Sequence, residues 1–266
     1  MELMLFTNDV VLARRAAEAG MGRIVIDLER RGKEQRQHGY HLECNWHTIN
    51  DVARMKAAVP IPVLCRVNPI HGNSPQEIDA VVAAGADVVM LPMFRHAEDV
   101  ESFLIGVRGR ARTSLLFETR EAVSLAPRLD PSVFDEVYVG LNDLAIAYGA
   151  RFCYELLADG MVDRLRACFP DKPFGFGGVT VLDGGAPIPT RLILMEQARL
   201  GCTQAIVRRA FTRDIHDRDM AFEIQRLATW HAHCRRRTPA EVAADRQRIH
   251  NAIMAAADAA PCRLWP

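Results

Sequence analysis

Two carboxylates each follow a short apolar run in the middle of the chain. Glu118 comes directly after the run Ser114–Phe117, and Asp143 lies just beyond the run Glu136–Gly140. In α/β enzymes the catalytic groups gather at the C-terminal ends of buried strands. Carboxylates from neighbouring strands can share a hard cation with water and substrate oxygens, and Mg²⁺ or Mn²⁺ needs few protein ligands. We therefore predict that Glu118 and Asp143 hold a divalent metal ion.

Three more charged residues follow other apolar runs. Arg66 offers a planar fork of donors that suits a substrate carboxylate, and we predict that it is catalytic and binds substrate. Asp27 and Glu29 could orient Arg66 or metal-bound water. Each residue also has a plain structural explanation, since Glu118 and Asp143 suit helix N-termini and Arg66 suits an ion pair. Their coincidence at strand ends favours a site.

Uncharged residues at the same strand ends are predicted to surround the substrate. Pro92 and Met93 follow the run Asp87–Leu91, and Leu141 and Asn142 stand directly before Asp143. We expect these four to contact the substrate beside Arg66.

Histidines supply the candidates for a general base near neutral pH. His38, His41 and His47 fall in the polar segment 29–47, and His71 follows the third apolar run. A solvated polar loop is the alternative explanation for His38 and His41. His47 just precedes a predicted helix and is our preferred catalytic histidine.

These residues need a scaffold of alternating strands and helices. The predicted strands are Leu3–Phe6, Arg23–Leu28, Pro62–Val67, Asp87–Leu91, Ser114–Phe117, Glu136–Val139, Phe174–Gly178 and Gln204–Val207. The helices expected between them are Asp9–Glu18, Ile49–Ala58, Pro75–Ala84, His96–Arg108, Thr119–Ala126, Asn142–Tyr148, Tyr154–Cys168 and Thr190–Leu200. Such alternation fits a doubly wound sheet or a (β/α)8 barrel, and eight units in one domain's length favour the barrel.

Two further helices, Asp214–Arg235 and Pro239–Ala259, follow the last strand. We therefore predict an α/β protein with a barrel core over residues 1–212 and C-terminal helices over 213–266. A barrel needs one closing helix, so the last is expected to pack on, or exchange with, a neighbouring subunit.

Composition excludes several other classes of protein. The 266 residues carry no net charge, which gives no support for binding nucleic acid or an acidic membrane surface. No apolar run approaches the roughly 18 residues that span a bilayer, and the acidic start of the chain is unlike a signal peptide. The seven cysteines show no CxxC spacing, which favours reduced thiols in a cytoplasmic protein.

The motifs DLE, RVN, AGADVVMLPM, ETREA and VGLNDLA, in this order, resemble a known family. They are similar to those of the pyruvate-utilising class II aldolases of the 2,4-dihydroxyhept-2-ene-1,7-dioate aldolase kind. This family is grouped with the citrate lyase β-subunit and malyl-CoA lyases. The resemblance extends over roughly residues 1–212, and ETREA with GLNDL is its most specific part.

The resemblance implies a phosphoenolpyruvate/pyruvate-binding TIM barrel that is often hexameric, with its last helix often exchanged between subunits. The family's ligands for Mg²⁺, Mn²⁺ or Co²⁺ fall on Glu118 and Asp143. Its arginine that binds the pyruvate carboxylate and stabilises the enolate falls on Arg66, and its acids after the second strand fall on Asp27 and Glu29. We therefore expect a homo-oligomer, a trimer or hexamer, that acts on a small-molecule substrate.

The sequence departs from the family at three places. Arg30 stands where the aldolases carry a histidine used in proton transfer, so His47, His41, His71 or metal-bound water is left as the base. Leu116 stands where a glutamine is common. The run after Asp27 lacks the second acid of the DLEDA motif, which weighs against a CoA thioester substrate.

The hypothesis from the sequence is a metal-dependent aldolase, a carbon–carbon lyase that makes or cleaves a 4-hydroxy-2-keto acid from pyruvate and an aldehyde through a pyruvate enolate. One alternative is a lyase or hydrolase on the same scaffold that acts on a CoA thioester or a small dicarboxylate. The other is a non-catalytic binding or assembly subunit.

Overall fold

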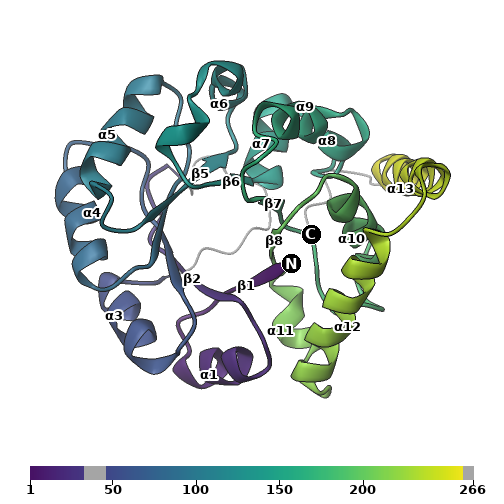
Figure 1. The fold of residues 1–266 in the computed structure, drawn as a ribbon, viewed down its shortest axis with the longest axis horizontal. Helices are drawn as coiled ribbons and strands as arrows, with labels where there is room; N and C mark the ends of the chain where they lie inside the picture. Colours follow the sequence, from purple (N-terminus) through teal and green to yellow (C-terminus); the bar gives the residue numbers. More distant parts are fainter. Residues whose placement is uncertain (33–45, 260–266) are drawn as a thin grey trace.

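Eight parallel strands in the described chain close into a barrel, in which each strand pairs with the next and the last pairs with the first (Figure 1). The computed structural model of the protein describes residues 1–32 and 46–259. The strands are β1 (Glu2–Phe6), β2 (Arg23–Asp27), β3 (Val63–Arg66), β4 (Val88–Leu91), β5 (Arg112–Phe117), β6 (Glu136–Val139), β7 (Phe174–Phe176) and β8 (Gln204–Ile206). The predicted (β/α)8 barrel is confirmed.

Helices surround the barrel on the outside (Figure 1). They are α1 (Val10–Glu18), α3 (Ile49–Ala58), α4 (Ser74–Ala83), α5 (Ala97–Val107), α6 (Arg120–Leu125), α7 (Leu141–Tyr148), α8 (Glu155–Ala158), α9 (Met161–Cys168), α10 (Thr190–Arg199), α11 (Ala210–Asp214), α12 (Met220–Cys234) and α13 (Pro239–Ala259). Two short 3-10 turns, η1 (Ala126–Arg128) and η2 (Pro131–Val133), precede β6.

Strand residues alternate between two apolar clusters. On β2, Ile24 and Ile26 pack between the strands and the helices, whereas Val25 packs inside the barrel. The interior cluster consists of Met4, Val25, Leu64, Val88, Met90, Leu116 and Tyr138, with Phe6 and Ile206 against it. Strands that are buried on both faces need apolar residues at successive positions, which explains runs such as RIVI.

Charged side chains close the floor of the barrel, at the N-terminal ends of the strands. Arg23 is 1% exposed, and its guanidinium donates to Glu136 at 2.8 Å and to Glu2 at 2.6 Å. Because β2 and β6 are four strand intervals apart in the ring of eight, the Arg23–Glu136 pair spans the interior. This end is therefore sealed by ion pairs, and the C-terminal ends of the strands remain for a site.

Two predicted helices are interrupted. The expected helix Tyr154–Cys168 is wrong as one element, because Gly160 takes a left-handed conformation with φ of 77° and separates α8 from α9. The expected helix Asp214–Arg235 is also wrong at its start, because the chain turns after α11 and begins α12 beyond Asp219. That side chain accepts a hydrogen bond from the Phe222 N–H and caps the new helix.

The C-terminal helices lie against the barrel of their own chain. Helix α12 packs on α10 and α1 and closes the ring of helices, and α13 packs on α10 and α8 (Figure 1). Arg237 ties the turn between them, since it donates to Asp245 and to the carbonyl oxygen of Met195 on α10. The boundary expected after residue 212 falls within α11, and exchange of a helix between subunits stays a prediction. Among the described residues, no helix combines the length and apolarity that crossing a membrane requires.

Candidate active site at the carboxyl ends of the strands

Alternation along the strands brings the predicted charged residues to one opening. Val25, Leu64 and Leu116 face the barrel interior. Asp27, Arg66 and Glu118 each follow two residues later, so they continue the inward row at the C-terminal ends of β2, β3 and β5. The opening at this end is called the mouth below.

Arg66 is held on the side of β2. Its Nε and Nη2 donate to the two carboxylate oxygens of Asp27 at 2.9 and 2.8 Å, and its Nη1 lies 3.4 Å from Glu29 Oε2. Its guanidinium also lies over the Phe6 ring. Although burial opposes the charge, the nearby carboxylates of Asp27, Glu29 and then Glu118 raise the pKa of Arg66 well above its ordinary value. Arg66 is therefore a permanent cation with a fixed orientation.

Asp27 is positioned in turn by a histidine. The Asp27 N–H donates to His47 Nδ1 at 3.0 Å, and both side chains are buried. An Nδ1 that accepts this bond carries no proton, so the neutral ring has its proton on Nε2. His47 thus lies beside the site as predicted, and in this tautomer it is a donor through Nε2 and not a base through Nδ1.

Glu118 is fixed by the backbone of the neighbouring strand end. It is 2% exposed, and its Oε1 accepts a hydrogen bond from the Met93 N–H at 3.0 Å. Met93 reaches this position in a left-handed conformation, with φ of 53°. That conformation is uncommon for a residue with a side chain, and it aims an amide at the carboxylate.

The two predicted metal ligands come from adjacent strand ends. Phe117 pairs with Val139, so Glu118 and Gly140 are the next residues on β5 and β6. A Cβ on Gly140 would stand 2.5 Å from Glu118 Oε2, so glycine leaves the space that this carboxylate occupies. Asp143 follows in the first turn of α7 and is 8% exposed. Two buried oxygen donors that follow adjacent strands fit a hard cation that completes its shell with water and substrate.

No larger group of ligands joins this pair within the described ranges. Residues 1–32 and 46–259 contain no cluster of three or more His, Cys, Asp or Glu that could hold a metal ion. The candidate donor set in this part of the chain is the pair Glu118 and Asp143.

The other predicted residues fall into three groups. Pro92 and Met93 are buried beside Glu118, and Asn142 is half-buried at the start of α7. Leu141 packs in the outer apolar cluster, so its side chain supports the barrel wall. His71 Nδ1 lies 2.7 Å from Ser74 Oγ at the start of α4.

Two further candidates cannot be placed. His38 and His41 lie outside the described residues, so their predicted role as base stays a prediction.

Arg30 stands where the resemblance predicts a histidine, and it links neighbouring segments of the chain through hydrogen bonds. Its Nη2 donates to the His47 carbonyl oxygen at 2.8 Å, and its N–H donates to Asn68 Oδ1 at 2.9 Å. Asn68 is held by Glu77. Arg30 therefore ties together both ends of the connection between β2 and α3 and the end of β3.

Two residues at the mouth were missed from the sequence, Arg208 after β8 and Tyr154 before α8. Arg208 follows the inward-facing Ile206 by two positions. A search for cations at all eight strand ends would have found it. Tyr154 had no local signal, because it was assigned to a continuous helix.

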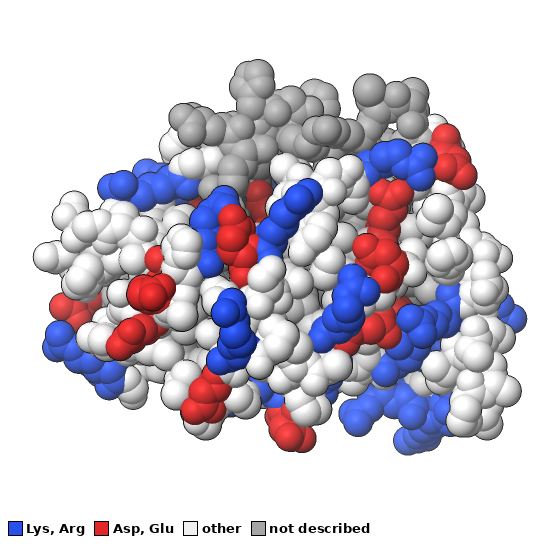
Figure 2. All heavy atoms as spheres, turned by 90° about the horizontal axis from the view of Figure 1, so that it is seen from above, with Lys and Arg blue, Asp and Glu red and all other residues white. Residues whose placement is uncertain are grey.

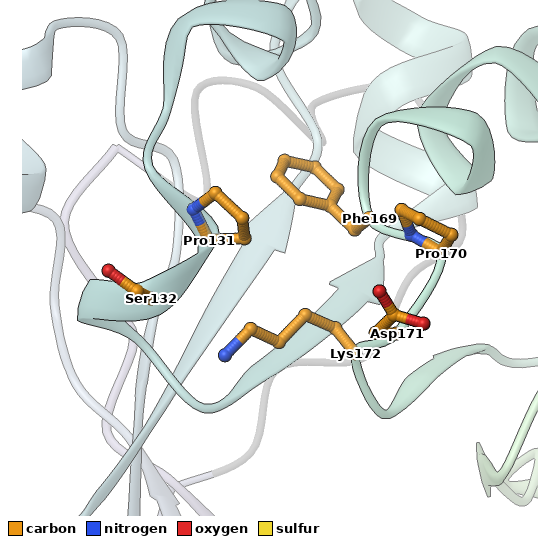
Figure 3. A pocket seen from close by; sticks show the side chains of 6 residues that line it. All are labelled: Pro131, Ser132, Phe169, Pro170, Asp171 and Lys172. Atoms are coloured by element: carbon orange, nitrogen blue, oxygen red, sulfur yellow. The ribbon is translucent and has the colours of Figure 1, made fainter.

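A pocket of about 220 Å³ lies at the other end of the barrel (Figure 3). It is formed by Pro131 and Ser132 ahead of β6 and by Phe169–Lys172 ahead of β7. Lys172 donates to the Phe134 carbonyl oxygen there. Because its residues precede the strands, this pocket is separate from the mouth.

On the face seen in Figure 2, acidic and basic side chains are interspersed.

Comparison with known proteins supports the fold. No protein-family model matches the sequence, and no curated protein matches it. The structure of RipC from Yersinia pestis is similar, with a TM-score of 0.54, 16% identity, and coverage of 91% of this chain and 98% of that one. The structure of citrate synthase SbnG is also similar, with a TM-score of 0.58, 17% identity, and coverage of 85% and 94%. At such identities the likeness establishes a shared barrel architecture.

Proposed function

We propose that this protein is a divalent-metal-dependent carbon–carbon lyase that makes or cleaves a 4-hydroxy-2-keto acid through a pyruvate enolate. The observation that carries the proposal is the placement of Arg66, a fixed and permanent cation, at the same mouth as the buried carboxylates Glu118 and Asp143. The name of one structural neighbour, a citrate synthase, is consistent with carbon–carbon chemistry on this fold.

Arg66 would bind the substrate carboxylate and remain beside the keto oxygen as that oxygen gains charge. Asp27 holds the guanidinium in one orientation through two hydrogen bonds. The Arg66 side chain therefore needs little reorganisation when negative charge develops on the substrate. Charge that exists only in the transition state is where such a cation accelerates a reaction most.

Glu118 and Asp143 would hold Mg²⁺, Mn²⁺ or, as the resemblance implies, Co²⁺, and the ion would supply Lewis-acid stabilisation of the enolate charge. The hydrogen bond from the Met93 N–H orients the Glu118 carboxylate for this purpose. His47 accepts a hydrogen bond from the Asp27 N–H through Nδ1 and so would hold the backbone at the end of β2 in place. The proton acceptor in the aldol step would be His41, His71 or a water molecule.

Enolate formation can be tested without knowing the aldehyde. In D₂O with Mn²⁺, the wild-type protein should exchange the methyl protons of pyruvate for deuterium, as followed by proton NMR, and EDTA should stop the exchange. Glu118→Gln should lower the exchange rate at least about 1,000-fold and weaken Mn²⁺ binding in electron paramagnetic resonance titrations.

The matched control is Glu121→Gln. Glu121 is an exposed acid three residues further along the chain and pairs with Arg95 at the surface. It should leave exchange and Mn²⁺ binding unchanged. Exchange that persists in EDTA would contradict metal dependence. Absence of both exchange and Mn²⁺ binding in the wild type would favour a non-catalytic barrel.

A synthase or lyase that uses a small di- or tricarboxylate is the second candidate, because the neighbour SbnG is named a citrate synthase. It would use the same cation and carboxylates. Product analysis after incubation of pyruvate with oxaloacetate or with simple aldehydes separates the two reactions.

A further inference from the structure

Tyr154 is a buried tyrosine whose hydroxyl lies at the end of β7. The residue is 2% exposed, and its ring packs against that of Phe152 nearly at right angles, with 5.1 Å between the ring centroids. Its hydroxyl oxygen lies 2.6 Å from the place where a Cβ on Gly178 would stand, two residues beyond β7. The ring is therefore fixed by packing, and its polar end reaches the mouth.

Two glycines leave space at this strand end. Gly178 has φ of 124°, a conformation that residues with side chains rarely adopt, and a Cβ there would overlap the phenol oxygen. Gly177 precedes it in the chain. The end of β7 therefore carries no side chain of its own over the Tyr154 hydroxyl.

The Tyr154 hydroxyl is an unused donor. It forms no hydrogen bond with another described residue. Fully buried side-chain atoms without a partner occur elsewhere in the described chain, as at Ser114 Oγ and His231 Nε2, but the Tyr154 oxygen is not among them. The oxygen therefore keeps accessible surface although the ring is buried. Such a hydroxyl can donate to a group that enters the mouth.

Arg208 places a positive charge beside this phenol. Its N–H donates to the Val179 carbonyl oxygen, and its side chain is half-buried, with Nη1 donating to the Ala186 carbonyl oxygen at 3.1 Å. Among the described residues, no carboxylate forms an ion pair with it. The guanidinium is therefore held in place while its charge stays available to a neighbouring anion.

The surroundings of Tyr154 keep its proton in place and would stabilise its loss. Burial raises the pKa of Tyr154 and the nearby Cys153 thiol raises it further, whereas the charge of Arg208 lowers it. Tyr138 on β6 is the other titratable group that faces it. The group is therefore a phenol at neutral pH, and a phenolate formed during a reaction would have a cation beside it.

The order of the strands places this donor next to the candidate metal pair. Glu118 follows β5, Asp143 lies beyond β6, and β6 pairs with β7, at whose end the Tyr154 hydroxyl lies. Arg66, at the end of β3, is on the other side of the pair. A keto acid held between Arg66 and the pair would therefore have the Tyr154 hydroxyl on its far side.

We propose that Tyr154 donates a proton to the aldehyde oxygen when the carbon–carbon bond forms, and that Arg208 stabilises the resulting phenolate. As C3 of the enolate bonds to the aldehyde carbon, the π electrons of the C=O group move onto its oxygen. That oxygen takes the proton of the Tyr154 hydroxyl, whose O–H electron pair stays on the phenolate. The phenolate then regains a proton from water, and cleavage runs the same transfers in reverse.

This inference rests on the proposed function and adds a residue to it. Arg30 stands where the resemblance predicts the histidine used in proton transfer, and the structure offers a different donor from another strand end. His41, His71 and water remain the candidates that accept the methyl proton of pyruvate. Tyr154 is then a catalytic residue of the aldehyde half of the reaction, and Arg208 acts through it.

Comparing two reactions of pyruvate separates this role from a structural one. Condensation with acetaldehyde or glycolaldehyde, with Mn²⁺ present, is followed by NMR of the 4-hydroxy-2-keto acid, and methyl exchange is measured in D₂O. Tyr154→Phe should lower condensation at least about 100-fold and leave exchange within about twofold, because enolate formation involves no aldehyde. The control is Tyr148→Phe, which removes the hydroxyl of a half-buried tyrosine on α7 that packs against Arg120. It should leave both rates unchanged.

A double-mutant cycle tests whether Arg208 acts through Tyr154. Arg208→Met should lower condensation about tenfold in the wild-type background and cause no further loss in Tyr154→Phe, since no phenolate then forms. Arg208→Lys should restore most of the rate, because it is the charge that stabilises the phenolate. Equal losses in both backgrounds would overturn the role of Arg208.

Thermal melting should show that the variants are folded. Condensation at the wild-type rate in Tyr154→Phe would overturn the proposed donor, and so would a joint loss of exchange and condensation, which is the mark of a structural role. Exchange in the wild type without condensation of either aldehyde would overturn this inference alone, since no aldehyde oxygen then receives a proton. A wild type that neither exchanges nor condenses would overturn the proposed function itself.

Discussion

Arg23 and Arg66 are each held between two carboxylates inside the same barrel, at opposite ends. Arg23 is 1% exposed and joins β2 to β6, directly across the ring, with Glu2 of β1 as a second partner. Arg66 is 14% exposed, and its partners, Asp27 and Glu29, come from the adjacent strand end alone. The floor arginine braces the barrel from side to side, whereas the mouth arginine is fastened on one side and keeps a face toward the opening.

The contrast shows how the same ion-pair chemistry serves two purposes. Burying an ion pair across the interior costs desolvation free energy. The attraction between the charges offsets this cost only when every partner is present. A pair at an opening can hold a cation in one orientation and still leave it available to a ligand. The predictions below test this division of roles.

The largest effect is expected from breaking the floor. Arg23→Met would leave the buried Glu136 carboxylate with only the half-exposed Arg112 as a cation, so the free energy of unfolding should fall by about 3 kcal/mol. Urea denaturation measures the change. Pyruvate exchange per folded molecule should stay at the wild-type level, and a matching loss of exchange would refute the division between floor and mouth.

The converse change is Arg66→Lys. It keeps the positive charge and loses the fork that Asp27 holds at two points, so pyruvate exchange should fall about 100-fold. Because lysine keeps a positive charge beside Asp27 and Glu29, the loss of unfolding free energy should be smaller than that of Arg23→Met. If exchange were normal and stability low, Arg66 would be a brace like Arg23.

His231 extends the comparison to a buried group with no opposing charge. It is 3% exposed on α12, and its Nε2 forms no hydrogen bond within the described residues. Burial, with the positive N-terminus and Arg235 nearby, lowers the pKa of His231 to about 4. Between about pH 6.5 and 4 the unfolded chain binds a proton that the folded chain does not, so stability should fall as pH falls through this window.

The expected loss between pH 7 and 4.5 is about 2 kcal/mol, measured by urea denaturation at each pH. His231→Phe should flatten the dependence. His216→Gln, which alters an exposed histidine, should retain it. A wild-type stability that is constant over this range would mean that His231 is charged in the folded protein.

The smallest effect is expected at Gly140. Its φ of −86° lies outside the left-handed region, so the position does not require glycine for its φ. The new Cβ would displace the Glu118 carboxylate, and Mn²⁺ affinity should fall about tenfold with little change in melting temperature. Gly175→Ala is the comparison near the floor, because its Cβ would stand 2.0 Å from the backbone oxygen of Gln204 and should lower stability with no specific effect on metal binding. Equal metal affinity in Gly140→Ala would contradict the assignment of Glu118 as a ligand.

Much of the fold could be predicted because strands buried on both faces leave a strong signal. Runs such as Ile24–Ile26 and Val88–Leu91 are continuously apolar and are flanked by charged residues or proline, and all eight predicted runs correspond to strands. The interruptions at Gly160 and Asp219 were missed because apolar residues recur at helical spacing on both sides of each turn.

For the site, the prediction depended on where each residue lies along its strand. Asp27, Arg66 and Glu118 could be placed at one opening because inward positions alternate along each strand. The Met93 conformation, the tautomer of His47 and the approach of Tyr154 to Gly178 depend on contacts between distant segments, which no local pattern records.

The bonds of Arg30 have a consequence for how this barrel holds its shape. Arg30 binds the His47 carbonyl and Asn68, so the chain on both sides of the β2–α3 connection is already brought together by residues next to the barrel. The cost of closing a loop grows slowly with its length, by about 0.6 kcal/mol for each doubling. Because these bonds already bring Arg30, His47 and the end of β3 together, closing the connection adds little to the cost of holding Asp27 and Arg66 in place.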